Sequence, residues 1–408
     1  MTPVQSVELS EKHVTLRFVL FAVFLLIAIV ALGAALIGFL NTGAGWQTIE
    51  ATKTSNLSCC DDFVFNYKFI SGAASTAERK KLTLLYTDTA EKAFALFTND
   101  VDVENVRNIK YINEHPNEEI EVDKALYDAF SLMKEYGARN LYFAPVYEVY
   151  DECFTCTDDS QLVSYDPYSS DEVKGFFAQA AVFANDPEMI DLELLDGNRV
   201  KLNVSDEYKS FAQENYIVSY IDFNWMKNAF IIDYIASELK ASGYLRGSIS
   251  SYDGFFRTLD TSGDEYAFAL YNRIGNTVTY VSQLSYTQPL SMVCLRDYRM
   301  NVRDSHYYEK ISGETLTPYV DTADGMSRQC RSNMVFYSGS DGCADILMQA
   351  APVYVAESFD AQKVEALKEN GVYSIYCEGY NVIDNGGVMT FGELAESYTD
   401  QILSNTDE

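Results

Sequence analysis

The polar residues with the clearest chemical potential lie between residues 221 and 257, at the turns of an otherwise apolar stretch. Asp222 ends a first apolar run, and Lys227 and Asn228 open an amphipathic helical pattern. Asp253 follows a second apolar run. This pattern predicts a strand, a helix and a second strand. A helix that begins just after a strand can offer backbone N–H groups to a ligand, so these side chains indicate a candidate binding site.

The same residue types also have purely structural explanations. Asp222 at a strand end, like Asp345 before a later helix, could cap the helix that follows. Trp225 could belong to the hydrophobic core. A lone histidine such as His306 makes a structural hydrogen bond more often than it takes part in catalysis. The residue types alone therefore leave both interpretations open.

Cysteines offer a second kind of chemistry. The chain has 8, including Cys59, Cys60 and the close pair Cys153 and Cys156. An even number permits disulfides in an oxidising compartment. A zinc site would need a second suitably spaced pair, which neither the other cysteines nor the 3 histidines supply. Acidic neighbours raise the thiol pKa values of Cys153 and Cys156, so we expect structural disulfides or inert thiols.

The N-terminal region contains an uncharged apolar run over residues 18–40. As a helix it would be about 35 Å long, which is enough to cross the hydrocarbon core of a bilayer. A cleaved leader usually has a shorter apolar segment, so we expect a single-pass signal anchor. Lys12 and Arg17 precede the run, which predicts that residues 1–17 are cytoplasmic. The cell membrane is then a partner, and the bulk of the chain is extracytoplasmic.

The charge balance is strongly acidic, with 60 Asp and Glu against 30 Lys and Arg and a formal net charge of −30. Such a surface repels nucleic acid and anionic lipid headgroups, so a polyanion-binding role is disfavoured. The 30 Tyr and 24 Phe supply ample apolar area for a folded core. The length of the chain fits one large domain or two modest ones.

The remaining pattern mixes strands and helices in no regular order. We expect strands at 63–70 and at 266–284 with a break at Gly275 and Asn276, helices at 89–97 and 126–137, a hairpin at 189–204, and a helix followed by a strand across 365–382. This mixture predicts an α+β fold. We place a linker at 41–59, a mixed α/β domain at 60–390 and an acidic C-terminal tail at 391–408.

Several motifs, in their order along roughly residues 60 to 385, resemble those of the FAD:protein FMN transferase (ApbE-type flavin transferase) family. The segment 137–145 is similar to the family's Gly-Ala-Phe-Asp-Pro-Thr-Val-Gly-Pro, and 221–230 to Ile-Asp-Leu-Gly-Gly-Ile-Ala-Lys-Gly-Tyr, with Asp233 closing the block. The segment 306–313 resembles His-Ile-Ile-Asp-Pro-Arg-Thr-Gly, and 344–350 resembles Ala-Asp-Ala-Leu-Ser-Thr-Ala. The shared order of these blocks carries the resemblance.

The sequence departs from the family at its glycine turns. Asn224 and Trp225 stand in place of one Gly-Gly pair, and the second pair is also missing around Asp253. Asn228 replaces the motif lysine, with Lys227 one position earlier. Side chains at such turns obstruct the close approach of backbone N–H groups to a ligand. These changes are concentrated at the expected ligand site.

The resemblance implies a flavin-transferase-like domain preceded by one transmembrane helix, with FAD as substrate and Mg²⁺ as cofactor. FMN would be transferred through phosphate to a Ser or Thr of a partner protein. The resemblance assigns catalysis to His306. It assigns Mg²⁺ binding to the backbone carbonyl of Lys227 and to the side chains of Asp345 and Gln349. The residues that it assigns to FAD binding are Tyr142, Asp222, Asn228, Asp253 and Gly313. The side chains of Asp345 and Gln349 offer the oxygen atoms that Mg²⁺ prefers.

Two near-equal hypotheses follow. The first is a divergent, membrane-anchored FMN transferase. The second is a non-catalytic member of the family that acts as a binding or assembly module of a membrane redox system, with a flavin-carrying redox protein as partner. An unrelated surface binding protein is a third class, but it leaves the order of the motifs unexplained. The chain is an enzyme only under the first hypothesis.

Overall fold

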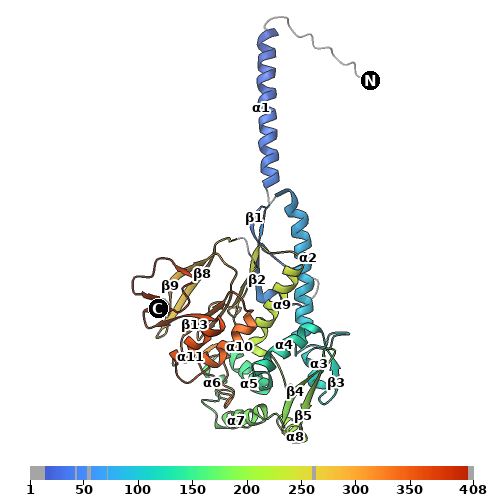
Figure 1. Cartoon of the computed structure of the whole chain (residues 1–408). Coiled ribbons are helices and arrows are strands. Elements are labelled where there is room, and N and C mark those ends of the chain that lie inside the picture. The colour runs from blue at the N-terminus through green and yellow to red at the C-terminus, as the bar shows by residue number, and fades with distance from the viewer. Residues whose placement is uncertain (1–13, 42–43, 53–56, 71, 260–262, 403–408) are drawn as a thin grey trace. The chain divides into compact units, whose positions relative to one another are not determined.

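The structure is a computed structural model that describes the backbone of residues 14–41, 44–52, 57–70, 72–259 and 263–402 (Figure 1). Side chains are described for residues 19–32, 44–52, 57–70, 75–259 and 263–399. Contacts within the chain divide it into two compact units, residues 1–47 with 68–81 and residues 48–67 with 82–408. Each unit is described by itself.

The first unit contains helix α1 (Val14–Asn41) and the first part of α2 (Gly72–Phe97). The apolar run at 18–40 lies within α1, so this segment is helical as the sequence predicts. In the part of the chain that the structure describes, however, no helix is both long enough and apolar enough to cross a membrane. The structure therefore does not support the transmembrane span expected at 18–40.

A nine-stranded sheet is the main β structure (Figure 1). In spatial order its strands are β1 (Gly45–Ile49), β2 (Phe63–Phe69), β6 (Gly247–Ser251), β7 (Phe255–Thr258), β10 (Ser291–Arg296), β13 (Asn333–Ser338), β14 (Tyr373–Glu378), β15 (Asn381–Asp384) and β17 (Thr399–Ile402). The pairs from β2 to β15 are antiparallel, and β15 pairs with β17 in parallel. Mixed pairing of this kind, together with the helices, confirms the predicted α+β class.

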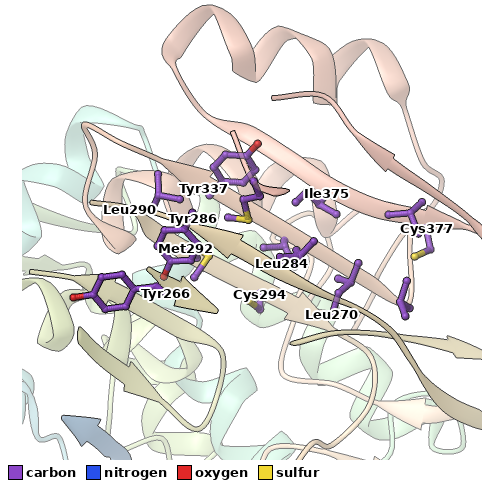
Figure 2. Packing of buried hydrophobic residues seen from close by; sticks show 14 of the residues in the cluster. Tyr266, Leu270, Leu284, Tyr286, Leu290, Met292, Cys294, Tyr337, Ile375 and Cys377 are labelled. Carbon is purple, nitrogen blue, oxygen red and sulfur yellow. The ribbon is translucent and has the colours of Figure 1, made fainter. Parts of the chain in front are cut away.

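Strands β10 and β13 are buried along their whole length because both faces of the sheet are covered there. Successive residues of a strand point to opposite faces. Met292 and Cys294 of β10 pack against Leu270 and Leu284 of the hairpin β8–β9 (Tyr266–Ile274 and Thr277–Tyr286), in the cluster that Figure 2 shows. Helices α9 (Lys227–Ala241) and α10 (Cys343–Tyr354) contact each other and cover the opposite face at β7. The sheet thereby supports the N-termini of both helices.

The remaining elements are short helices and three small sheets. The helices are α3 (Ile109–Glu114), α4 (Lys124–Glu135), α5 (Ala144–Thr155), α6 (Asp159–Leu162), α7 (Asp171–Asn185), α8 (Asp206–Glu214) and α11 (Ala361–Ala366), with 3-10 turns η1 (Cys60–Asp62), η2 (Asn140–Phe143), η3 (Asn224–Met226) and η4 (Leu367–Asn370). The small sheets join β3 (Glu119–Glu121), β5 (Arg199–Val204) and β4 (Ile190–Leu195), then β16 (Thr390–Phe391), β9 and β8, and finally β11 (Tyr308–Glu309) and β12 (Thr315–Leu316).

Several predicted elements are confirmed where local chemistry decides the structure. Helix α4 buries Leu126, Phe130 and Met133 on one face, and the Asp123 side chain caps it by accepting the Ala125 N–H at 2.9 Å. The hairpin predicted at 189–204 is β4–β5, and the break in 266–284 is the turn between β8 and β9. Strand β2 and the end of α2 also lie where the sequence predicts them.

Strand β1 lies within residues 41–59, and β16 and β17 lie at Thr390–Phe391 and Thr399–Ile402. One predicted element differs from the structure. Residues 221–223 are not a strand, so that prediction is wrong. Hydrogen bonds at the candidate site account for the absence of a strand at residues 221–223.

Candidate functional site

A cavity of about 460 Å³ lies at the N-terminus of α9, where the sequence predicts a binding site. Its wall includes two basic side chains, Lys227 and Arg303, and the imidazole of His306. The carboxylates of its wall are those of Asp62, Asp100, Asp151, Asp222 and Asp253. With His306 neutral, these groups carry a formal charge of −3, and we call this space the acidic cavity.

Asn113 of α3 holds the segment that carries Asp222. Its Nδ2 donates to the Ile221 carbonyl at 2.8 Å, and its Oδ1 accepts the N–H groups of Tyr220 and Ile221, each at 3.0 Å. The N–H of Asp222 donates to the Leu141 carbonyl at 2.9 Å. These bonds satisfy the backbone in place of a strand ladder, which explains why residues 221–223 are not a strand. Sequence patterns do not single out Asn113, because its partners lie about a hundred residues away in the chain.

The turn that leads into α9 keeps a glycine-like backbone without a glycine. Asn224 has a φ of 48°, a left-handed conformation that asparagine adopts more readily than most residues. Trp225 is 6% exposed, and its Nε1 donates to the Tyr147 hydroxyl at 2.6 Å. Its ring stands edge-on to that of Tyr319. Side chains therefore occupy the space that two glycines would leave open to a ligand.

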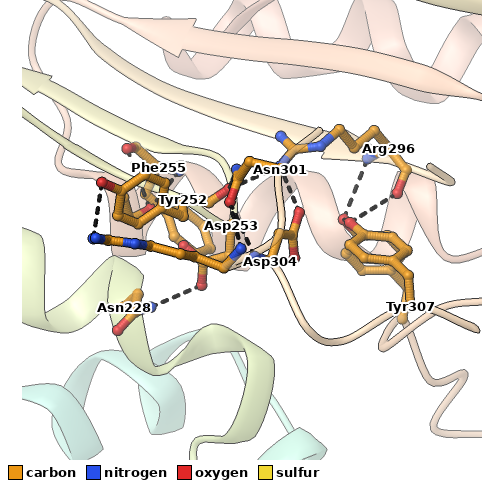
Figure 3. Close-up of polar contacts among 11 residues, drawn as sticks. Asn228, Tyr252, Asp253, Phe255, Arg296, Asn301, Asp304 and Tyr307 are labelled. Atoms are coloured by element: carbon orange, nitrogen blue, oxygen red, sulfur yellow. Dashed lines mark hydrogen bonds and ion pairs between the residues drawn. The ribbon is translucent and has the colours of Figure 1, made fainter. Parts of the chain in front are cut away.

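Asp253 lies in the turn between β6 and β7 and is tied to α9. The Nδ2 of Asn228 donates to its Oδ2 at 2.9 Å (Figure 3). Gly254 follows with a φ of 113°, and a Cβ there would collide with the Cys294 carbonyl. The Oδ1 atoms of Asp253, Asn228 and Asp222 are buried and have no hydrogen-bond partner among the described residues. One of these three acceptor atoms lies in the β6–β7 turn, and the other two lie at or just before the start of α9.

His306 is carried by the loop between β10 and β11, which a buried ion pair holds in place. Arg296 Nη2 lies 2.7 Å from Asp304 Oδ2 and donates to the Tyr252 carbonyl at 2.9 Å (Figure 3). The Tyr307 hydroxyl donates to the Arg296 carbonyl at 3.1 Å. The residues on both sides of His306 are therefore fixed, and its ring is positioned at the acidic cavity.

Burial and charge act together on the titratable groups of the acidic cavity. Burial raises the pKa of Asp222, and the ammonium of Lys227 opposes that rise. Burial lowers the pKa of His306, the carboxylate of Asp253 opposes this change, and Lys227 adds to it. Lys227 thus acts at longer range on both a carboxylate and an imidazole.

The residues inferred to bind Mg²⁺ are not assembled around one space. Asp345 lines a separate cavity of about 650 Å³, whose wall includes neither Lys227 nor His306 among the described residues. Gln349 lies one turn further along α10, and its Nε2 donates to the Asp345 carbonyl at 3.4 Å. Lys227 opens α9, so its carbonyl is used by the intrahelical hydrogen-bond ladder.

The described part of the chain also contains no group of three His, Cys, Asp or Glu side chains that could hold a metal ion. Because the three inferred donors do not converge either, the residues present do not fit a preassembled Mg²⁺ site. Burial, together with the neighbouring carboxylates of Asp233, Asp341 and Glu135, raises the pKa of Asp345.

Tyr142 and Gly313 are not brought to the acidic cavity. The Tyr142 hydroxyl accepts the Leu192 N–H at 2.9 Å, and the Arg139 guanidinium lies 4.0 Å above its ring. Gly313 forms the turn between β11 and β12 with a φ of 87°, and a Cβ there would collide with the Asn276 side chain. In this structure both residues have structural contacts that account for them. Of the sequence-predicted residues, those that line the acidic cavity are Asp222, Lys227, Asn228, Asp253 and His306.

The cysteines are all free thiols, so the structure holds no disulfide among them. Cys153 is buried at the end of α5, and burial raises its pKa to about 12, with Asp166 adding to the rise. The pKa of Cys156 is raised as well, mainly by burial and to a smaller extent by nearby carboxylates. Of the two expectations, these raised pKa values favour inert thiols for this pair.

Comparison with solved structures identifies the fold. The chain is similar to the ApbE protein from Thermotoga maritima, with a TM-score of 0.54 and 12% sequence identity over 81% of this chain and 93% of that one. It is also similar to a variant of the flavin transferase ApbE from Vibrio cholerae, with a TM-score of 0.49 and 10% identity over 82% and 94% of the two chains. No protein-family model and no curated protein matches the sequence. The chain therefore has the fold of the Thermotoga maritima ApbE protein, which is the fold that its motifs predict.

Proposed function

We propose that the protein is a flavin-transferase-like binding module that does not catalyse Mg²⁺-dependent FMN transfer. One observation carries the proposal: His306 and Lys227 line the acidic cavity, whereas Asp345 lines another. When FMN is transferred from FAD, charge develops on phosphate oxygens, and a cation must neutralise it there. A metal held at Asp345 would not share a cavity with the candidate catalytic histidine.

The charge of the acidic cavity also opposes a diphosphate. At an effective dielectric constant of about 20, a carboxylate about 8 Å from a phosphate charge repels it by roughly 2 kcal/mol. Five aspartates outnumber Lys227 and Arg303 in this wall. Arg303 is already engaged, because its Nη1 donates to the Tyr252 hydroxyl at 3.0 Å and its guanidinium lies over that ring.

The test is an AMP-release assay on the full-length protein in detergent, with FAD, Mg²⁺ and a Ser/Thr acceptor peptide. The flavin transferase ApbE from Vibrio cholerae serves as the positive control for the assay. We expect no AMP above the buffer rate and no FAD-dependent heat in calorimetry. Release of AMP that disappears in Asp345→Ala would refute the proposal.

The alternative is a divergent transferase that moves FMN from FAD to a Ser or Thr of a partner. A specific observation favours it: the Oε1 atom of Gln349 is buried without a partner among the described residues, one turn from Asp345. Mg²⁺ commonly uses one or two protein oxygens and completes its shell with water and substrate phosphates. The AMP-release assay decides between the two functions.

The membrane anchor belongs to the same proposal. Its support is the uncharged run at 18–40, preceded by Lys12 and Arg17, which would place the binding module outside the cell membrane. A flavin-carrying redox protein in that membrane is the proposed partner. Resistance of the full chain to carbonate extraction supports the anchor, and release into the supernatant refutes it.

A further inference from the structure

A buried pair of opposite charges, Lys310 and Asp166, has no part in the site described above. Lys310 Nζ lies 2.7 Å from Asp166 Oδ2, and the two side chains are 11% and 0% exposed. The described wall of the acidic cavity includes neither residue. Burying two charges is costly, and such a pair does not by itself indicate a gain in stability. The amine and the carboxyl group are instead in contact at a place that excludes most water.

The fold holds these two groups together from segments far apart in the sequence. Asp166 lies between α6 and α7, and Lys310 directly follows β11. Asp159 of α6 fixes the chain on both sides of Lys310, because its Oδ1 accepts the Tyr308 hydroxyl at 2.9 Å and its Oδ2 accepts the Ile311 N–H at 3.2 Å. Two groups held in reactive contact can have an effective concentration of roughly 10⁵ M or more. This geometry favours a reaction between the amine and the carboxyl group.

The neighbours of the pair supply the groups that amide formation requires. Glu314 Oε2 lies 3.7 Å from Lys310 Nζ, so its carboxylate can accept a proton from the ammonium. The Tyr168 N–H donates to Asp166 Oδ1 at 3.0 Å, and negative charge develops on this oxygen when an amine attacks the carboxyl carbon. The Ser169 hydroxyl donates to Oδ2 at 2.8 Å, and Oδ2 is the oxygen that would leave. A nucleophile, a proton acceptor and an oxyanion donor therefore surround one carboxyl group.

We propose that Lys310 and Asp166 condense to form an intramolecular isopeptide bond. Lys310 Nζ attacks Cγ of Asp166, the N–C bond forms, and the bond from Cγ to Oδ2 breaks. Nζ loses two protons, one by way of Glu314 and one directly to Oδ2. Both protons end on Oδ2, which leaves as one molecule of water, so the reaction consumes no oxidant and no cofactor. The low exposure of the site keeps bulk water away and disfavours hydrolysis of the new bond.

The bond would fix one end of the loop that carries His306. Lys310 directly follows β11, and this loop lies between β10 and β11. A covalent link between distant segments reduces the conformational entropy of the unfolded chain, as a disulfide does. The cysteines are free thiols, so the isopeptide bond would supply a cross-link that they do not. The inference does not rest on the proposed function, because it concerns a different place in the fold.

Mass spectrometry of the full-length protein tests this bond. The protein is purified in detergent, denatured, reduced and digested, and the digest is searched for a peptide that joins Lys310 to Asp166. Lys310→Arg keeps the positive charge but removes the amine. Lys209→Arg is the matched control, because Lys209 and Asp206 form an exposed pair with 3.6 Å between Nζ and Oδ1.

The role of Glu314 is tested by the rate of linking. The linked fraction is followed with time after synthesis in the wild type and in Glu314→Gln. Glu309→Gln is the control, because Glu309 is an exposed glutamate of the same hairpin. A proton acceptor commonly accelerates a reaction by a factor of about 10² or more, so Glu314→Gln should link much more slowly and Glu309→Gln at the rate of the wild type.

We expect a linked peptide that is about 18 Da, the mass of one water, lighter than its two parts together. It should be present in the wild type and in Lys209→Arg and absent in Lys310→Arg. A wild type that contains only the separate peptides overturns the inference, whether or not the variants fold. A link that persists in Lys310→Arg also overturns it, and equal linking rates in Glu314→Gln and the wild type overturn the proton transfer through Glu314.

Discussion

Asp233 of α9 caps a helix other than its own, because its Oδ2 accepts the backbone N–H of Ala344 at 2.9 Å. Its Oδ1 accepts the N–H of Cys343 at 3.0 Å and pairs with the Arg257 guanidinium. The cap of α10 is therefore supplied by Asp233 and not by Asp345, for which the sequence left a capping role open. This carboxylate links α9, α10 and strand β7.

Replacing this carboxylate should destabilise the protein strongly. Asp233→Ala removes two capping bonds and leaves Arg257 largely buried without its partner. Losing one member of a buried ion pair costs about 3–5 kcal/mol of unfolding free energy. Denaturant unfolding measures this change. Asp206→Ala is the control, since the exposed pair of Asp206 with Lys209 should contribute less than about 1 kcal/mol. Equal effects of the two substitutions would contradict the assignment.

The titration of His306 should report the charges of the acidic cavity. Lys227 lowers the pKa of His306 and Asp253 raises it. Lys227→Met should therefore move this pKa upward, and Asp253→Asn should move it downward. NMR of the imidazole protons measures both shifts, with the His306 signal assigned by its loss in His306→Gln. Shifts of the same sign in the two variants would show that the ring does not lie between these charges.

How far the sequence predicts this molecule depends on the range of the interactions involved. Helix α4 and the hairpin β4–β5 follow from local periodicity, a capping aspartate and a turn glycine, so they are found in advance. The cavity wall is different. Asn113 and Arg296 act on segments far from them in sequence, and the separation of Asp345 from His306 depends on how two helices meet the sheet. Motif order predicts the fold, but it does not predict which side chains share a cavity.

Acidification should destabilise the wild type more than His306→Gln. Burial holds the folded-state pKa of His306 below its ordinary value of 6.5. Below that pH the unfolded state binds a proton at this ring that the folded state does not, so the unfolding free energy falls as the pH drops. Denaturant unfolding at pH 7.5 and pH 5 measures the difference between wild type and variant. A steeper loss in the variant would contradict an imidazole that stays neutral in the folded protein.

Leu284 is a fully buried residue of the hairpin β8–β9 and should contribute strongly to the unfolding free energy. Leu284 is 0% exposed and packs in the cluster beneath β10 and β13. Leu284→Ala should lower the unfolding free energy by about 2–5 kcal/mol, because the truncation leaves a cavity that close-packed strands fill poorly. Val278→Ala on the same strand is the control, since Val278 is 38% exposed and should cost less than about 1 kcal/mol. If both substitutions cost the same, the hairpin does not cover this face of the sheet in solution.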